Sequence, residues 1–452
     1  MEVPVWGLVP FVVMLAAIAI FPLWHVTEHI WEKNTVKLAL ALVLGIPVGV
    51  WMWVAYSPEL VVHELNEYAQ FISLLFSLFV VSGGIFVAGD IKATPRNNTL
   101  LLAAGGVLAS FIGTTGAAML LIRPLLNTNK ERERKIHTVI FAILIVANCG
   151  GLLTPLGDPP LYIGMMRGVP FTWTFSLWPQ WLFVVGMLLL SYYGLDRRAY
   201  AKETDFHVFW DEHDKQPISV RGLLNIVWFL VIIASVAFLG DYEYLKIGVQ
   251  LLAALASFYT TKRSIRFDDN EFTWSPILEV AALFIGIFLT MIPALEFLRA
   301  HAHSMPLNEY TFFAFTGVLS SVLDNAPTYL TFFEMGTQFT LGNAVAGVPE
   351  LYLAAISTGA VFCGAMTYIG NGPNFMVKAV AEEKGVPMPS FGGYIVYSLR
   401  DLAPILVAQA MIFLSDGGWV RIVGILIAMV VAAIAARNIV RNPLPETVDE
   451  AK

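Results

Sequence analysis

The sequence predicts an all-α polytopic membrane protein with about eleven transmembrane helices, two re-entrant hairpins and an inverted-topology repeat. Three observations predict this fold. The 452-residue chain is 57% hydrophobic and only 13% charged, with a mean hydropathy of +0.69. Two stretches that interrupt hydrophobic segments with Gly, Pro, Asn and Asp resemble each other, and the basic residues gather on one side of the segments. A soluble chain could not bury so much apolar surface, so we expect a lipid bilayer around it.

The apolar segments follow one another along the whole chain. The first lacks a basic region before it and a small-residue cleavage site, so we expect a retained span and not a signal peptide. The expected spans are 4–24, 36–56, 70–88, 136–165, 171–195, 222–240, 243–261, 276–298, 351–376, 391–415 and 419–437.

Two further apolar segments, 99–127 and 310–341, are too long for one span and are polar at their middle. A hairpin that enters and leaves the membrane on the same face fits them better than a crossing. Backbone that is not helical is tolerated at membrane depth only where protein buries it or where it lines a wet cavity. Each hairpin tip is therefore expected beside a binding site.

The polar interruptions occur in two copies. The offset between the copies is 211 residues at Gly106 and Gly317, and 217 residues at Gly168 and Gly385. The first copy contains Gly113-Thr114-Thr115-Gly116, Asn148-Cys149-Gly150-Gly151 and Thr154-Pro155-Leu156-Gly157-Asp158-Pro159-Pro160. The second contains Ser320-Ser321, Asp324-Asn325-Ala326-Pro327-Thr328 and Thr367-Tyr368-Ile369-Gly370-Asn371-Gly372-Pro373-Asn374. Paired, broken hydrophobic segments in two halves are the best sequence indication of a secondary transporter's binding site.

The distribution of basic residues orients the chain. If the hairpins do not cross the membrane, only Arg167 and Arg299 lie on one face, and the other basic residues outside the spans lie on the opposite face. The basic face is expected to be cytoplasmic, which places the N-terminus outside and the C-terminus inside a bacterial inner membrane. Five crossings in the first repeat invert the second. The expected parts are a first repeat at 1–195, a cytoplasmic linker at 196–221, a second repeat at 222–441 and a tail at 442–452.

Hydroxyl, amide and carboxylate groups at the interruptions are suitable ligands for a hard cation such as sodium. The candidate ion ligands are Asp324, Asn325, Ser321 and Thr328 in the second hairpin, Thr114 and Thr115 in the first, Asn148, Thr154 and Asp158 in the first broken helix, and Thr367, Asn371 and Asn374 in the second. Asp324 and Asp158 are the strongest candidates, because a carboxylate at membrane depth needs a cation, a proton or a partner. Asp158 precedes Pro159, so it could instead cap the helix that follows.

Other polar groups have simpler explanations. We expect Cys149 and Cys363 to be small packing residues. Arg123 and Glu334 correspond at the offset of 211, and a structural or gating role is expected for both. Arg400-Asp401 indicates either a helix that begins late or an anion-binding arginine. Two His/acid clusters are expected to be solvated surface, and they comprise His25, Glu28, His29 and Glu32, and Asp205, His207, Asp211, Glu212, His213 and Asp214.

Some function classes are not supported. The chain carries no catalytic nucleophile motif, no Walker A sequence and no basic nucleic-acid patch. We therefore expect no enzyme, no ATP-driven transport, no bound cofactor and no nucleic-acid partner, but only transported or coupling Na⁺ and H⁺.

The segments Asn148–Pro170, Ser320–Thr328 and Thr367–Asn374 resemble the ion transporter superfamily, in particular bacterial chains classed as sodium/proton antiporters or citrate transporters. That group includes NhaD-like sodium/proton antiporters, citrate–metal symporters and divalent-anion/sodium symporters. The resemblance covers about residues 36–415. It implies two hairpins and two broken helices around the site, and a homodimer with a scaffold domain and an elevator-like transport domain. The first tip lacks the Asp and Asn that relatives carry there, which puts two equivalent ion sites in doubt.

Two transport functions follow from these residues. A sodium/proton antiporter is favoured, because acids mark the interruptions and no basic residue does. The alternative is a symporter of citrate or another carboxylate, in which helix N-termini and bound sodium would hold the anion. A membrane protein that does not transport, such as a receptor, is disfavoured by the duplicated interruptions.

Overall fold

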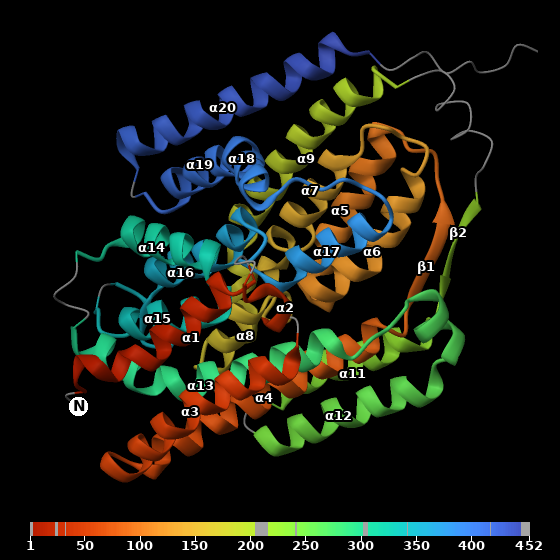
Figure 1. Ribbon diagram of the computed structural model, residues 1–452. Helices are drawn as coiled ribbons and strands as arrows, with labels where there is room; N and C mark the ends of the chain where they lie inside the picture. Colours follow the sequence, from red (N-terminus) through yellow and green to blue (C-terminus); the bar gives the residue numbers. More distant parts are fainter. Residues whose placement is uncertain are drawn as a thin grey trace, which may run out of the picture. The chain divides into compact units, whose positions relative to one another are not determined.

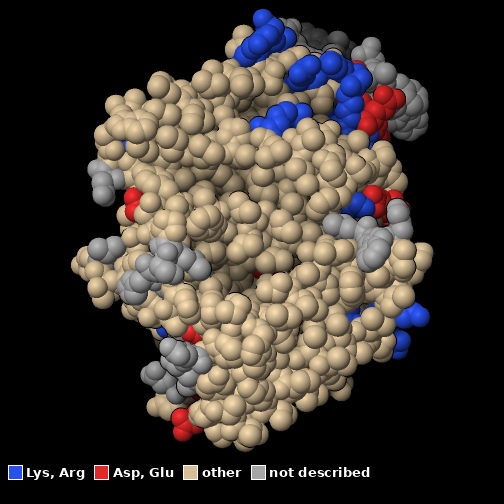
Figure 2. Space-filling model, turned by 60° about the vertical axis from the view of Figure 1, so that its left-hand side comes forward, with Lys and Arg blue, Asp and Glu red and all other residues tan. Residues whose placement is uncertain are grey.

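The computed structural model describes residues 3–22, 26–31, 33–203, 216–239, 242–301, 306–340, 342–415 and 417–443. Six helices in this part are long and apolar enough to cross a bilayer, and a pair bent by 42° makes a seventh if it is counted as one span. The protein is therefore an all-α polytopic membrane protein, as predicted. Much of the face drawn in Figure 2 carries neither acidic nor basic side chains, as a lipid-facing surface requires.

The chain divides into two compact units, and both combine segments from the two halves of the sequence. The first unit comprises Met1–Phe86, Pro159–Trp173 and Gly222–Ala360. The second comprises Val87–Asp158, Thr174–Arg221 and Val361–Lys452. Compact units and sequence repeats are thus different divisions of this chain.

The first unit is built around three long helices. Its elements are η1 (Val5–Leu8), α1 (Val9–Ile20), α2 (Glu28–Trp31), α3 (Asn34–Ala55), α4 (Pro58–Ser82), α8 (Pro159–Met166), α11 (Leu224–Phe238), α12 (Glu243–Thr260), η4 (Ser264–Asp269), α13 (Ser275–His301), α14 (Glu309–Val322), α15 (Asn325–Gly336), β3 (Ala344–Val345), β4 (Val348–Pro349) and most of α16 (Glu350–Cys363). Helices α3, α4 and α13 lie side by side (Figure 1). Small residues allow α3 and α13 to approach each other closely. A Cβ on Gly286 of α13 would lie only 2.7 Å from Ala41 of α3, which is too close for a side chain.

The second unit surrounds α7 (Ile136–Ile145). Every residue of α7 from Thr138 onward is buried, which fits a helix that is apolar on all sides. It contacts α5 (Pro95–Ile112), α6 (Thr114–Thr128), α9 (Trp178–Tyr200), α17 (Gly372–Glu383) and α18 (Phe391–Asp401), and Figure 1 shows it among them. The remaining elements are β1 (Phe86–Asp90), η2 (Cys149–Leu153), most of η3 (Phe171–Leu177), β2 (Gln216–Arg221), η6 (Gly364–Met366), α19 (Ala403–Phe413) and α20 (Gly418–Arg441).

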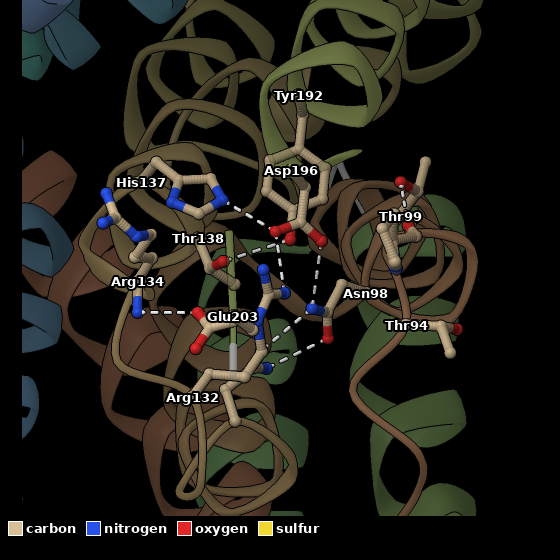
Figure 3. A network of polar contacts seen from close by, with 12 residues as sticks. Thr94, Asn98, Thr99, Arg132, Arg134, His137, Thr138, Tyr192, Asp196 and Glu203 are labelled. Atoms are coloured by element: carbon tan, nitrogen blue, oxygen red, sulfur yellow. Dashed lines mark hydrogen bonds and ion pairs between the residues drawn. The ribbon is translucent and has the colours of Figure 1, made fainter. Parts of the chain in front are cut away.

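A buried ionic network fixes the ends of the first hairpin (Figure 3). Asp196 of α9 is fully buried, and its Oδ1 forms an ion pair with Arg132 at 2.7 Å and a hydrogen bond with His137 at 2.8 Å. Asn98 of α5 donates to the other carboxylate oxygen at 3.3 Å. Burial is the largest influence on the pKa of Arg132 and lowers it, but Asp196, Tyr192 and Glu203 together outweigh burial, so this pKa lies above its ordinary value. The network joins α5, α7 and α9.

The structure corrects several expected boundaries. The span expected at 70–88 is α4, which begins at Pro58, and residues Phe86–Asp90 form a strand that pairs with β2. The prediction began too late because Glu64 and Glu67 lower the hydropathy of the first turns. Both side chains are in fact buried within the protein. The expected linker at 196–221 begins inside α9 and ends in β2, and neither short sheet was predicted.

Other expectations can be compared with the structure only in part, because some of their residues are outside the described ranges. Arg400 and Asp401 do not precede a late helix, because α18 begins at Phe391 and the helix bends after them. Cys149 and Cys363 are buried free thiols. The linker cluster from Asp205 to Asp214, together with His25, Glu32 and most of the tail, lies outside the described residues.

Candidate functional site

Both broken helices open at the residues that the sequence indicates. The first break separates α7 from α8 and contains η2 and the segment from Thr154 to Asp158. The second separates α16 from α17 and contains η6 and the segment from Thr367 to Asn371. Each of α8 and α17 begins with a proline in its first turn, where the missing N–H has no partner within the helix in any case. Because each break creates two helix ends, it leaves N–H and C=O groups that are not hydrogen-bonded within a helix.

Amides from the two halves of the sequence meet inside the second unit. Asn148 donates from Nδ2 to Oδ1 of Asn374 at 2.6 Å, and Asn371 donates to Oδ1 of Asn148 at 3.2 Å. The three side chains are at most 3% exposed. The second break thus lies directly against the first, although more than 220 residues separate them, from Asn148 to Asn374. This pairing is the geometric core of the candidate site.

Asp158 is the acid of this site. It is 2% exposed, and its Oδ1 accepts from the hydroxyl of Thr114 at 2.8 Å and from the amide of Asn371 at 3.2 Å. Thr114 belongs to the first hairpin, Asp158 to the first broken helix and Asn371 to the second. Three of the predicted interruptions therefore converge on one carboxylate oxygen through neutral donors.

Backbone contacts hold the first hairpin tip against the first break. The N–H of Thr114 donates to the carbonyl of Gly157 at 2.8 Å. Gly113 has φ of +83°, a conformation that favours glycine, and it ends α5 so that α6 can begin. A side chain at Gly157 would collide with the carbonyl of Gly151, so only glycine permits this approach. Ser110, which also packs here, donates to the carbonyl of Gly150.

Several predicted ligands shape the breaks themselves. Thr154 donates to the carbonyl of Ser110, and its hydroxyl accepts the N–H of Leu156. The hydroxyl of Thr367 accepts the N–H groups of Ile369 and Gly370, both at 3.2 Å. Their side-chain oxygens thus stabilise the local turns of the two breaks.

Asn374 belongs to the hydrogen-bond network around Asn148 and Asp158, whereas Thr115 does not. Asn374 donates to the carbonyls of Gly364 and Thr367, at 2.8 and 2.9 Å, which fixes the loop before α17. Thr115 is half-buried in α6 and takes no part in the hydrogen bonds described for this site. The neighbouring threonines 114 and 115 are therefore not equivalent.

The second hairpin tip lies in the first unit and uses its acid differently. Asp324 precedes α15, and its Oδ1 accepts the N–H of Ala326 at 3.1 Å, so that the carboxylate caps the helix. Thr328 donates to the carbonyl of Asp324 at 3.1 Å, while Ser321 donates to that of Val318 at 2.7 Å. Asn325 is fully buried. Capping was considered in the sequence for Asp158, and the structure shows a capping carboxylate at Asp324 as well.

Oxygen atoms suitable for sodium are present in both places. In the second unit they are the carboxylate of Asp158, the amide oxygens of Asn148 and Asn371, the hydroxyl of Thr114 and the carbonyls of the breaks. In the first unit they are the carboxylate and carbonyl of Asp324 and the side chain of Asn325. All are hard ligands of the kind that small cations prefer.

A buried ionic cluster in the first unit was not predicted from the sequence. Arg167, which follows α8, donates to Glu64 and Glu67 of α4, both at 2.9 Å, and to Glu334 of α15 at 2.6 Å. His63 lies 3.1 Å from Glu67. The cluster joins α4, α8 and α15, which agrees with the structural role expected for Glu334. An available signal was the pair of acids three residues apart, Glu64 and Glu67, directly before the apolar segment at 70–88.

Comparisons with known proteins agree with this architecture. Residues 1–414 match a family described as "Putative citrate transport". The chain is also 23% identical over 390 residues to the "46 kDa membrane protein" of Mycobacterium leprae (strain TN), a match that covers 80% of this chain and 90% of that protein. The family match spans both hairpins and both broken helices. The chain therefore belongs to this citrate-transport family of membrane proteins.

Proposed function

We propose that the protein is a secondary active transporter that exchanges sodium for protons, with Asp158 and Asp324 as the groups that bind one or the other. The observation that supports this most is the position of Asp158. It is nearly completely buried, and it accepts hydrogen bonds from Thr114 and Asn371 of two different interruptions. A carboxylate in such a place is stabilised by a proton or by a small cation, and exchange between them is the elementary step of antiport.

The two hairpins and two broken helices supply the moving parts in this proposal. Sodium would enter an oxygen-lined space at the breaks, and the loss of a proton from a carboxylate would accompany its binding. Movement of these elements against the rest of the chain would then present the ion to the other face, in an elevator-type cycle within a homodimer. Rigid-body movement of one bundle against another is a common form of alternating access.

Symport of citrate or another carboxylate is the second candidate. The family description favours it directly. Against it, the described side-chain donors at the Asp158 network are hydroxyl and amide groups, and a trianion beside Asp158 would be repelled unless cations accompanied it. A citrate–cation complex would remove part of that repulsion, so transport assays must include both substrates.

Proteoliposomes that contain a pH-sensitive dye separate the two functions. Sodium or lithium added outside should collapse a preset proton gradient between pH 6.5 and 9, whereas choline should not. Labelled citrate should not accumulate under the same conditions. Sodium-dependent citrate uptake, together with no dye response over that pH range, would establish symport and refute the antiport proposal.

A further inference from the structure

A groove in the second unit lies apart from the Asp158 network. It has a volume of about 820 Å³ and is lined by α9, by the junction of α18 and α19, and by α20. This volume lies within the range of about 300–1,000 Å³ that is typical of small-molecule sites. None of the transport elements described above needs this groove, so its chemistry requires a separate explanation.

One end of the groove is strongly basic. Arg198 from α9, Arg400 from α18 and Arg437 and Arg441 from α20 all line it. Among the described residues that line it, the one acid is Asp401, which pairs with Arg400 at 2.8 and 2.6 Å. Within the part of the chain that the structure describes, Arg198, Arg437 and Arg441 have no acidic partner. Guanidinium groups on converging elements match the geometry of a phosphate group.

The wall next to these arginines is apolar. Leu426, Val430 and Ile434 occupy successive turns of α20 and are 51%, 60% and 57% exposed. Arg437 and Arg441 continue the same face of the helix, because three or four residues make one turn. The apolar stripe therefore leads directly to the basic end. Figure 2 shows Lys and Arg gathered beside a broad uncharged surface, at the upper edge where Figure 1 draws the end of α20.

We propose that this groove binds an anionic phospholipid, with the phosphate held by Arg198, Arg437 and Arg441 and the acyl chains lying along α20. Its basic end is expected at the cytoplasmic boundary, where anionic lipids meet basic pockets between helices. A phospholipid matches both ends of the groove, whereas a free anion would leave the apolar stripe uncovered. The ligand would tie α20 to α9 and α18.

A second copy of the chain fits the groove less well. Between Gly418 and Arg441, α20 contains no acidic residue. A symmetric contact through this face would bring Arg437 and Arg441 of both copies together without compensating charge, which is unfavourable. Charge complementarity thus selects a lipid headgroup over self-association.

The test uses full-length protein, purified in a neutral detergent and stripped of lipid, with binding measured by native mass spectrometry. Phosphatidylglycerol should bind more tightly than phosphatidylcholine, and added salt should weaken only the former. In the variant Arg437→Ala/Arg441→Ala, phosphatidylglycerol binding should fall about tenfold or more. The control Arg96→Ala/Arg134→Ala removes two exposed arginines elsewhere and should change binding less than twofold.

Three outcomes would overturn the proposal. The first is unchanged phosphatidylglycerol binding in Arg437→Ala/Arg441→Ala when its melting temperature equals that of the wild type. The second is competition by inorganic phosphate at the same concentration as the lipid, which would indicate a free-anion site. The third is loss of a dimer in that variant with lipid bound per protomer unchanged, which would indicate a subunit contact. If the alanine variant misfolds, Arg437→Lys/Arg441→Lys replaces it and should bind with intermediate affinity.

Discussion

The α5–α6 and α14–α15 hairpins are the same kind of element, yet their tips are used differently. The first tip has no acid of its own, and Thr114 donates to Asp158 of the neighbouring broken helix. The second tip carries Asp324, which caps its own helix. In the first case the acid accepts from donors on two other segments, and in the second it accepts from the backbone of its own helix. The acid at the first tip thus belongs to a neighbouring element, whereas the acid at the second tip belongs to the tip itself.

The largest effect is expected at Asp158. Asp158→Asn keeps the shape of the side chain but removes the charge and the exchangeable proton, so sodium-driven proton movement in proteoliposomes should disappear. The protein should still fold, because the amide can accept from Thr114 and Asn371 through its oxygen. Exchange at the wild-type rate in this variant would exclude Asp158 from ion binding.

Asp324→Asn tests the other tip. Asn is as good a helix cap as Asp, so folding should be retained while exchange is lost. Asp324→Ala should lose exchange and also destabilise α15 by about 1 kcal/mol, seen as a lower melting temperature. If Asp324→Asn kept full exchange and full sodium affinity, capping would be the whole role of this residue.

A stability effect is expected at the ionic cluster of the first unit. Arg167→Met leaves Glu64, Glu67 and Glu334 buried without their shared cation and should cost about 3–5 kcal/mol. Adding Glu64→Gln to Arg167→Met removes one of the uncompensated charges and should recover part of the lost melting temperature. An unchanged melting temperature in Arg167→Met would refute the stabilising role, and Arg96→Met is the exposed control.

Smaller effects are expected from the neutral donors of Asp158. Asn371→Ala removes a donor from the second half of the sequence and should weaken the apparent sodium affinity about tenfold, and Thr114→Val should weaken it about fivefold. Thr115→Val is the matched control, since this neighbour lies outside the network, and it should leave affinity unchanged. Equal effects of the two threonine variants would contradict the described geometry.

The sequence predicted the places where the helices break, but not how the breaks pair. Gly, Pro and Asn mark a break because they affect the backbone locally, so Thr154–Asp158 and Thr367–Asn371 could be found without coordinates. Which partners a carboxylate meets depends on tertiary packing, so the contacts of Asp158 with Thr114 and Asn371 could not be predicted from the sequence. The cluster around Arg167 was missed because its partners lie about 100 and 167 residues away in the sequence. Two of them, Glu64 and Glu67, also lower the apparent hydropathy of α4.

Proton release on sodium binding tests the central claim most directly. The claim is that Asp158 and Asp324, contributed by different kinds of element, serve one exchange cycle. Sodium added to weakly buffered, purified protein should release protons from the wild type, and release should be absent from both Asp158→Asn and Asp324→Asn. Wild-type proton release from Asp158→Asn would contradict the account.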